Sequence, residues 1–104
     1  MLKSPNLQHY LNSEPTKGII RVYNIQSEKT LLLISKDIIE DSKNIRFQLD
    51  LGFYDNQELQ SEYSEIGLEV FAIDPFIIQK DDEDLDILLE KAKNILQSKN
   101  ILFY

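Results

Sequence analysis

Two apolar runs separated by a short polar turn constrain the fold of this chain most. Residues 18–25 (GIIRVYNI) are rich in β-branched and aromatic side chains, and residues 30–35 (TLLLIS) form an almost continuous apolar run. The four residues between them, QSEK, are polar, so the pattern predicts an antiparallel hairpin. Because the second run is apolar at consecutive positions, both its faces should be covered, and we expect it to be the central strand.

The residues after this hairpin predict a first long helix. Ser35 can act as its N-cap, and the helix should run from Lys36 to about Leu51. Gly52 follows at the position where a glycine commonly ends a helix. Ile38, Ser42, Ile45 and Leu49 recur at helical spacing and should face the core.

A second helix should follow a loop of aromatic and polar residues. Asp55 and Glu58 have the spacing of a capping box, with Asp in place of the usual Ser or Thr. Gly67 should end this helix. Its buried side is expected to consist of Leu59, Tyr63 and Ile66.

The rest of the chain predicts one more strand and one more helix. Residues 69–76 read as a strand at a sheet edge, because Pro75 lacks the N–H that a central strand needs. Residues 81–98 have apolar side chains at spacings of three and four, which is typical of an amphipathic helix. Residues 101–104 (ILFY) are apolar and should pack against the body or another molecule.

These elements predict one small α/β, more strictly α+β, domain. Its sheet should be three-stranded, mainly antiparallel and flanked by helices, in the order strand, strand, helix, helix, strand, helix. We divide the chain into an N-terminal extension (1–17), in which Ser4 and Pro5 begin a short helix, a central domain (18–98) and an apolar C-terminal tail (99–104). A chain of 104 residues has room for one modest core.

Charge and composition exclude several classes of protein. Eleven basic and 18 acidic side chains give a net charge of −7, and the basic ones are scattered, which argues against nucleic acid as a partner. No apolar run approaches the ~20 residues of a membrane helix. The N-terminus lacks the apolar stretch of a signal peptide, so we expect a cytoplasmic protein without a membrane partner.

Tests for metal and catalytic motifs are negative. The run DDEDLD has the first carboxylates of an EF-hand loop, but Ile87 stands at the glycine position and Lys93 at the position of the bidentate glutamate. His9 is the sole histidine and is read as a surface or packing residue. The chain has no cysteine and no phosphate-binding glycine loop. We therefore expect neither a metal site nor a cofactor.

Residues 18–98 resemble the GIY-YIG nuclease domain, with a register free of gaps from Gly18 to Gly67. Gly18-Ile19-Ile20 resembles the GIY element, and Leu31-Leu32-Leu33 falls where YIG would stand when residues are counted forward without gaps. Ser35-Lys36-Asp37-Ile38 resembles the SxNI-type segment that opens the first helix. The pattern "HRFxLxxGxHxNxxLQ", common in small stand-alone bacterial members, is matched by Arg46-Phe47-Gln48-Leu49, Leu51-Gly52, Asn56, Glu58, Leu59 and Gln60.

The resemblance implies metal-assisted phosphodiester hydrolysis in active members, but the corresponding positions here lack the required groups. The two signature tyrosines become Ile20 and Leu31, the arginine that steadies the phosphate becomes Asp41, the assisting histidine becomes Ile45, and the metal-binding glutamate becomes Ala92. Aliphatic groups cannot move protons, and a carboxylate repels a phosphate. No catalytic residue is therefore expected.

Two functions remain open at this point. The first is an inactive GIY-YIG-like domain that binds another protein or a second copy, through the edge of the third strand, through the tail, or through an apolar patch at the former cleft. That patch would consist of Ile20, Leu31, Ile45 and Ala92, which otherwise fill the core. The second is a residual Mg- or Mn-dependent endonuclease or nucleic-acid binder that uses Arg46, Tyr54 and Asn56, with a shifted alignment placing Glu90 at the metal.

Overall fold

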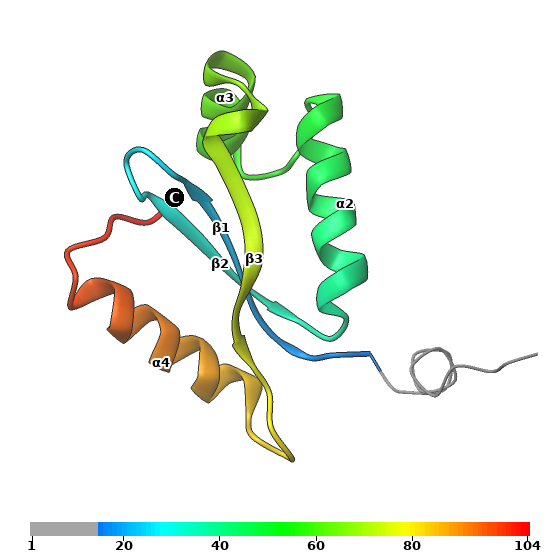
Figure 1. Cartoon of the computed structure of the whole chain (residues 1–104), viewed down its shortest axis with the longest axis vertical. Helices are drawn as coiled ribbons and strands as arrows, with labels where there is room; N and C mark the ends of the chain where they lie inside the picture. The colour runs from blue at the N-terminus through cyan, green and yellow to red at the C-terminus, as the bar shows by residue number, and fades with distance from the viewer. Residues whose placement is uncertain (1–14) are drawn as a thin grey trace, which may run out of the picture.

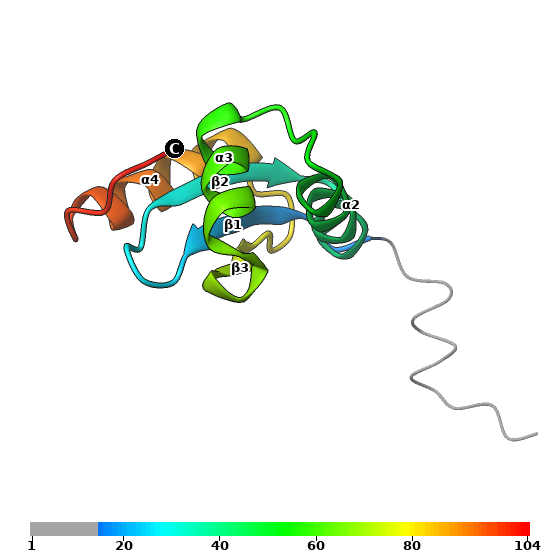
Figure 2. The same cartoon turned by 90° about the horizontal axis from the view of Figure 1, so that it is seen from above.

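The computed structural model describes residues 15–104, so the expected N-terminal helix and His9 lie outside the described residues. The fold is α+β, with a three-stranded antiparallel sheet in the order β2-β1-β3 between helical layers (Figure 1). Helices α2 and α3 cover one face of the sheet, and α4 covers the other (Figure 2). Each layer encloses its own apolar cluster, so the core is divided by the sheet.

The predicted hairpin is present as β1 (Gly18–Asn24) and β2 (Thr30–Ser35). The central strand, however, is β1, and the expectation that the second strand is central was wrong. A run of consecutive apolar residues indicates that both faces of a strand are covered. An edge strand that lies between two helical layers is also covered on both faces, so the run does not distinguish an edge strand from a central one. Side chains of β2 do pack toward both layers, Leu31 and Leu33 toward one and Leu32 toward the other.

The third strand, β3 (Phe71–Ile78), pairs with the other side of β1 and follows a short 3-10 helix, η1 (Leu68–Val70). It is an edge strand, which confirms the prediction made from Pro75. The pairing with β1 is regular except between Ile19 and Ile20, which lie opposite Ile77 and Pro75. The extra residue on β3 makes a bulge, a feature that hinders pairing with a further strand.

Helix α2 (Ile38–Leu51) begins later than expected because Asp37, not Ser35, is its N-cap. The Asp37 carboxylate accepts a hydrogen bond from the Glu40 N–H at 3.1 Å. Gly52 ends the helix with φ +87°, as the sequence predicted, and this left-handed conformation favours glycine. The inward-facing residues Ile38, Ile45 and Leu49 are buried.

Helix α3 (Gln57–Ile66) is capped by Asn56, so the predicted capping box at Asp55 was wrong by one residue. The Asn56 side chain accepts from the Leu59 N–H at 3.0 Å. Ile66, expected on the buried side, is 45% exposed, and Gln60 is buried in its place. Gly67 ends the helix, as the sequence predicted.

Helix α4 (Leu85–Gln97) lies on the opposite face of the sheet. The side chain of Asp84, the residue before the helix, accepts hydrogen bonds from the Asp86 and Ile87 N–H groups and so caps the first turn. Its buried residues are Leu88, Ala92 and Leu96. The chain then returns to β2, where Thr30 and Phe103 form a parallel bridge. The tail therefore packs against the body, one of the two outcomes expected for it. No helix within residues 15–104 is both long and apolar enough to cross a membrane.

Candidate functional site

A hollow of about 330 Å³ between the hairpin and α2 holds three of the five positions that the resemblance identifies: Ile20, Asp41 and Ile45. Two carboxylates, Asp41 and Asp55, line it, and no basic side chain does. The rest of the lining is apolar or carries an amide or a phenol. It consists of Leu33, Ile34, Asn44, Gln48 and Tyr54.

Asp41 is held in a defined position in the first turn of α2. The Ser35 hydroxyl donates to the Asp41 carboxylate at 2.6 Å and accepts from the Asp37 N–H at 3.1 Å. Ser35 itself is buried at the end of β2. The serine that the sequence suggested as a helix cap thus orients a carboxylate at the rim of the hollow.

The four residues of the expected apolar patch do not meet in one depression. Ile20 and Ile45, 0% and 7% exposed, lie in the cluster under α2 and α3, and Leu31 packs against the same cluster. Ala92 is buried with Ile19 on the other face of the sheet. Neighbouring residues of a strand point to opposite faces, so Ile19 faces α4 while Ile20 faces α2, and the sheet separates Ala92 from the other three.

The residues at the position that the resemblance assigns to the metal-binding glutamate do not fit a divalent ion. Ala92 has no ligand atom, and Glu90 lies on the exposed side of α4, where its carboxylate is 3.7 Å from the Lys93 ammonium. Within residues 15–104 no three His, Cys, Asp or Glu side chains are grouped closely enough to hold a metal ion.

The three residues of the alternative nucleic-acid site also lie apart. Tyr54 lines the hollow, and burial, followed by the charge of Asp55, raises the pKa of its phenol. The side chain of Asn56 is engaged as the cap of α3. Arg46 lines a different groove, of about 460 Å³, between α2 and β3.

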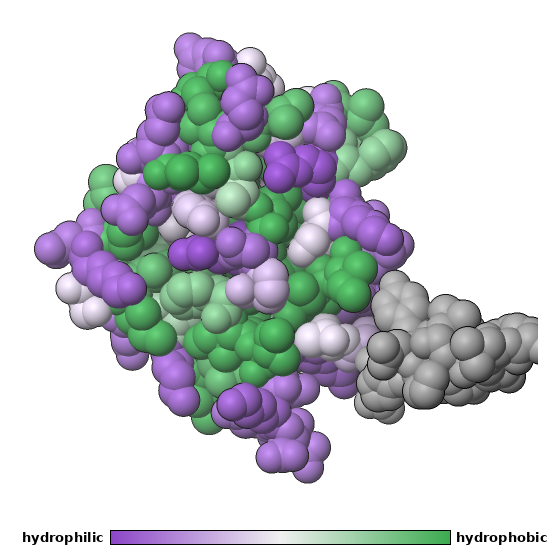
Figure 3. All heavy atoms as spheres, viewed as in Figure 1, coloured by the Kyte–Doolittle hydropathy of each residue, from purple (hydrophilic) through white to green (hydrophobic). Residues whose placement is uncertain are grey.

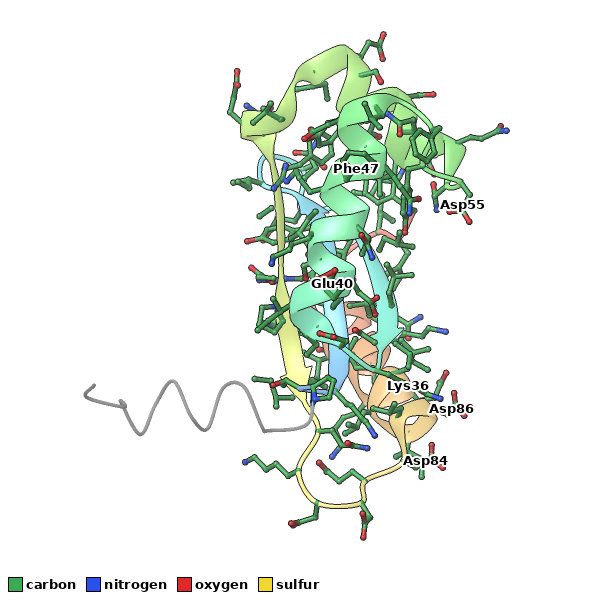
Figure 4. All side chains as sticks on the ribbon, turned by 90° about the vertical axis from the view of Figure 1, so that its right-hand side faces the viewer. Lys36, Glu40, Phe47, Asp55, Asp84 and Asp86 are labelled. Carbon is green, nitrogen blue, oxygen red and sulfur yellow. The ribbon has the colours of Figure 1, made fainter. Side chains whose placement is uncertain are left out.

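That groove combines basic and aromatic side chains. The Arg46 guanidinium donates to the Tyr63 hydroxyl at 3.1 Å, and Tyr63 donates to the Asp50 carboxylate. Burial raises the pKa of Tyr63, and the hydrogen bond to Asp50 raises it further. Lys43 and Phe47 also line the groove, and Phe47 is 59% exposed on the outer surface of α2 (Figure 4).

A polar cluster that the sequence did not reveal holds the tail. The Tyr104 hydroxyl donates to the Glu62 carboxylate at 2.8 Å, and the Lys29 ammonium lies 4.0 Å from that carboxylate and 5.0 Å from the centre of the Tyr104 ring. Lys29 also forms an ion pair with Glu58. These residues come from the hairpin turn, α3 and the tail, so no local motif in the sequence marks them.

The fold of this chain is similar to that of a nuclease domain of known structure. The chain is similar to the catalytic domain of the homing endonuclease I-TevI, with a TM-score of 0.63 and 20% identity over 81% of this chain and 88% of that one. A mutant of this intron endonuclease domain aligns with a TM-score of 0.62 and 21% identity over 82% and 84% of the two chains. The fold is GIY-YIG-like.

The GIY-YIG-like fold explains why the register from Gly18 to Gly67 resembled that domain. No family model matches the sequence, and no curated protein matches it. The scaffold is therefore shared with I-TevI while little of the sequence is.

Proposed function

We propose that this chain is a catalytically inactive GIY-YIG-like domain that acts as an interaction module, binding another protein or a second copy of itself. The observation that carries the proposal is the Asp41 carboxylate in the hollow, at the position that the resemblance assigns to an arginine. An anionic side chain fixed there by Ser35 opposes the binding of a phosphodiester.

The aliphatic side chains around Asp41 also support inactivity. Ile20 and Ile45 stand where the resemblance places a tyrosine and a histidine, and neither can donate or accept a proton. Leu31, the other tyrosine position, is equally inert. A nuclease built on this scaffold would need its water-activating and phosphate-binding groups from somewhere else.

Exposed apolar side chains support the interaction role. Phe47, Leu51 and Phe53 are each more than half exposed, at and just beyond the second half of α2. Figure 3 shows hydrophobic side chains gathered near this end of α2 and along β3, interrupted by hydrophilic ones. Apolar surface of this kind, rimmed by polar residues, is typical of protein-binding sites.

One observation favours nucleic-acid binding as a second candidate. Lys43 and Arg46 share the groove with exposed Phe47, and basic side chains beside an aromatic ring are a common arrangement for single-stranded nucleic acid. The net charge of −7 opposes this candidate, because the whole surface repels a polyanion. The same groove also contains Asp50.

A plasmid-nicking assay tests the proposal. Purified protein is incubated with supercoiled plasmid and Mg²⁺ or Mn²⁺, with the I-TevI catalytic domain as positive control, and we expect no nicked product. Fluorescence anisotropy with a labelled single strand at low salt should show no binding. Metal-dependent nicking or binding that is lost in Arg46→Ala but kept in Lys36→Ala, a lysine outside the groove (Figure 4), would overturn the proposal.

A further inference from the structure

The edge of β2 that faces away from β1 is only partly covered. The Thr30 N–H donates to the Leu102 carbonyl at 2.9 Å, and the Tyr104 N–H donates to the Thr30 carbonyl at 3.0 Å, so the backbone polar groups of Thr30 point away from β1. The register between β1 and β2 is regular, and Leu32 and Ile34 therefore present theirs to the same edge. In the described part of the chain, neither of these two residues has a backbone partner there.

The other edge of the sheet, at β3, is protected against pairing. It carries Pro75, which has no N–H, and a bulge opposite Ile19 and Ile20. The β2 edge has neither feature, and Ile34 is 37% exposed on it. An open edge of this kind can accept an extended peptide as an added strand, with backbone hydrogen bonds supplying affinity and side-chain pockets supplying specificity.

The acidic hollow lies beside this open stretch of β2. Leu33 and Ile34 line it together with Asp41 and Asp55. Figure 4 shows Asp55 toward the side of β2 and away from β3. Leu33 packs toward the α2 layer. Residues directly opposite each other on two paired strands point to the same face of the sheet, so a side chain opposite Leu33 on an added strand would point toward the hollow.

Both carboxylates of the hollow are available to a ligand. Asp41 accepts a hydrogen bond from the Ser35 hydroxyl through Oδ2, and its Oδ1 accepts none from residues 15–104. The ion pairs formed among these residues involve neither Asp41 nor Asp55. None of the described residues that line the hollow is basic. A cation in the hollow would meet two negative charges at a site where charges interact more strongly than in bulk water.

We propose that the open edge of β2 binds an extended segment of another protein as an added strand, with a lysine or arginine opposite Leu33 that enters the hollow between Asp41 and Asp55. The inference rests on the proposed interaction role and names the chemistry of the partner. The net charge of −7 favours the approach of a cationic segment. A second copy of β2 does not fit the hollow, because residues 30–35 carry no basic side chain.

The other face of the sheet determines which residues fit beside the cation. Side chains alternate along a strand, so the two neighbours of the lysine or arginine would point toward the α4 layer. A hollow of about 410 Å³ on that side is lined by Leu32, Phe103 and Lys93. Apolar side chains fit against Leu32 and Phe103, while a second cation would meet the Lys93 ammonium. The expected recognition pattern is therefore apolar, basic, apolar.

Fluorescence anisotropy with a capped, fluorescein-labelled peptide of sequence STVKVTS tests the ligand side of the contact. We expect binding that weakens at least about tenfold when glutamine replaces the lysine. A peptide that is N-methylated at the lysine and both valines cannot donate to β2 in either strand direction, and it should not bind. No binding of the lysine peptide at about 1 mM, or equal binding of the glutamine or the N-methylated peptide, would overturn the inference.

Variants of the hollow test the protein side. Asp41→Asn and Asp55→Asn should each weaken binding of the lysine peptide about fivefold. Glu40→Gln is the matched control, because it removes the same charge from α2 outside the hollow (Figure 4) and should change binding less than about twofold. An equal loss in all three variants would mean that net charge alone attracts the peptide, and it would overturn the site.

A proline at the edge tests strand addition separately from charge. Ile34→Pro removes the outward N–H and leaves the bonds to β1, which the neighbours Leu33 and Ser35 make. It should weaken peptide binding at least about tenfold, while Ile34→Thr, which keeps the N–H, should weaken it less than about threefold. Unchanged binding by folded Ile34→Pro protein would overturn strand addition, and the N-methylated peptide tests the same step without any substitution in the protein.

Sedimentation of the protein alone covers the competing occupant. A dimer that Ile34→Pro dissociates would show that a second copy fills the edge and would overturn the assignment to a basic segment. Absence of peptide binding would overturn this inference alone, because the plasmid and single-strand assays measure the proposed function with other ligands. Nicking of the plasmid would overturn the proposed inactivity, and the peptide titrations would still decide the role of the edge.

Discussion

Gly18, at the start of the GIY-like element, has a structural role that can be tested. A Cβ at this position would stand 2.1 Å from the Ile77 carbonyl oxygen and 3.0 Å from the Ile78 Cα, both in the backbone of β3. Gly18→Ala should therefore lower the free energy of unfolding by more than about 2 kcal/mol, within the larger range of single substitutions. Urea denaturation followed by circular dichroism measures the change.

Gly52→Ala is the matched control for that substitution. Gly52 has open space around its Cα but φ +87°, so alanine there should cost only about 1 kcal/mol through its backbone conformation. Equal losses in the two variants would contradict a steric role for Gly18 and indicate that β3 shifts to make room.

At the scale of single residues, the sequence predicted the site only in part. Counting positions assigned Ile20, Leu31, Asp41 and Ile45 to one site, and three of them, Ile20, Asp41 and Ile45, line one hollow because β1, β2 and α2 follow one another without insertions. It did not place Ala92, because which face α4 covers depends on the path of the chain after β3. Hydrogen bonds such as Ser35 to Asp41 depend on side-chain direction, which residue spacing does not determine.

Among the helices and strands, the N-cap of α3 is a point at which the sequence prediction and the structure differ: the sequence favoured Asp55, and the structure has Asn56. The Asn56 side chain accepts from the Leu59 N–H, so Asn56→Ala should lower the free energy of unfolding by about 1 kcal/mol. Asp55→Ala, at the position that the sequence favoured, should change it by less than about 0.5 kcal/mol, as is usual for surface sites. Thermal and urea melts of the two variants measure the difference, and the reverse order would contradict the structural assignment.

The elements themselves were largely predictable, and their neighbours in the sheet were not. Apolar periodicity and glycines at helix ends gave three strands and three helices close to their observed positions, since both signals are local. The order β2-β1-β3 was not predicted, because the apolar run of β2 indicates only that both faces of the strand are covered. It does not indicate whether the strand has a neighbour on one side or on both. The tail docks on the edge of β2 that does not pair with β1.

At the scale of the whole molecule, three tyrosines couple stability to alkaline pH. The pKa of Tyr63 and that of Tyr54 are raised mainly by burial, and the pKa of Tyr104 is raised by burial and by its bond to Glu62. The unfolded chain releases these protons near pH 10, while the folded chain retains them. Stability from this source is therefore complete below about pH 10 and is lost as pH rises through the folded pKa values.

The free energy of unfolding should accordingly fall between pH 9 and pH 11, and it should fall less steeply when the three tyrosines are replaced by phenylalanine. Lysines and ion pairs contribute equally to both proteins, so the difference between the two slopes isolates the phenols. Urea denaturation at several pH values measures both slopes. Tyr63 belongs to the core cluster under α2 and α3, and Tyr54 and Tyr104 pack against that cluster. Equal slopes for the two proteins would therefore mean that these phenols ionise as freely in the folded state as in the unfolded state. That result would argue against the packing of Tyr104 on the body of the domain.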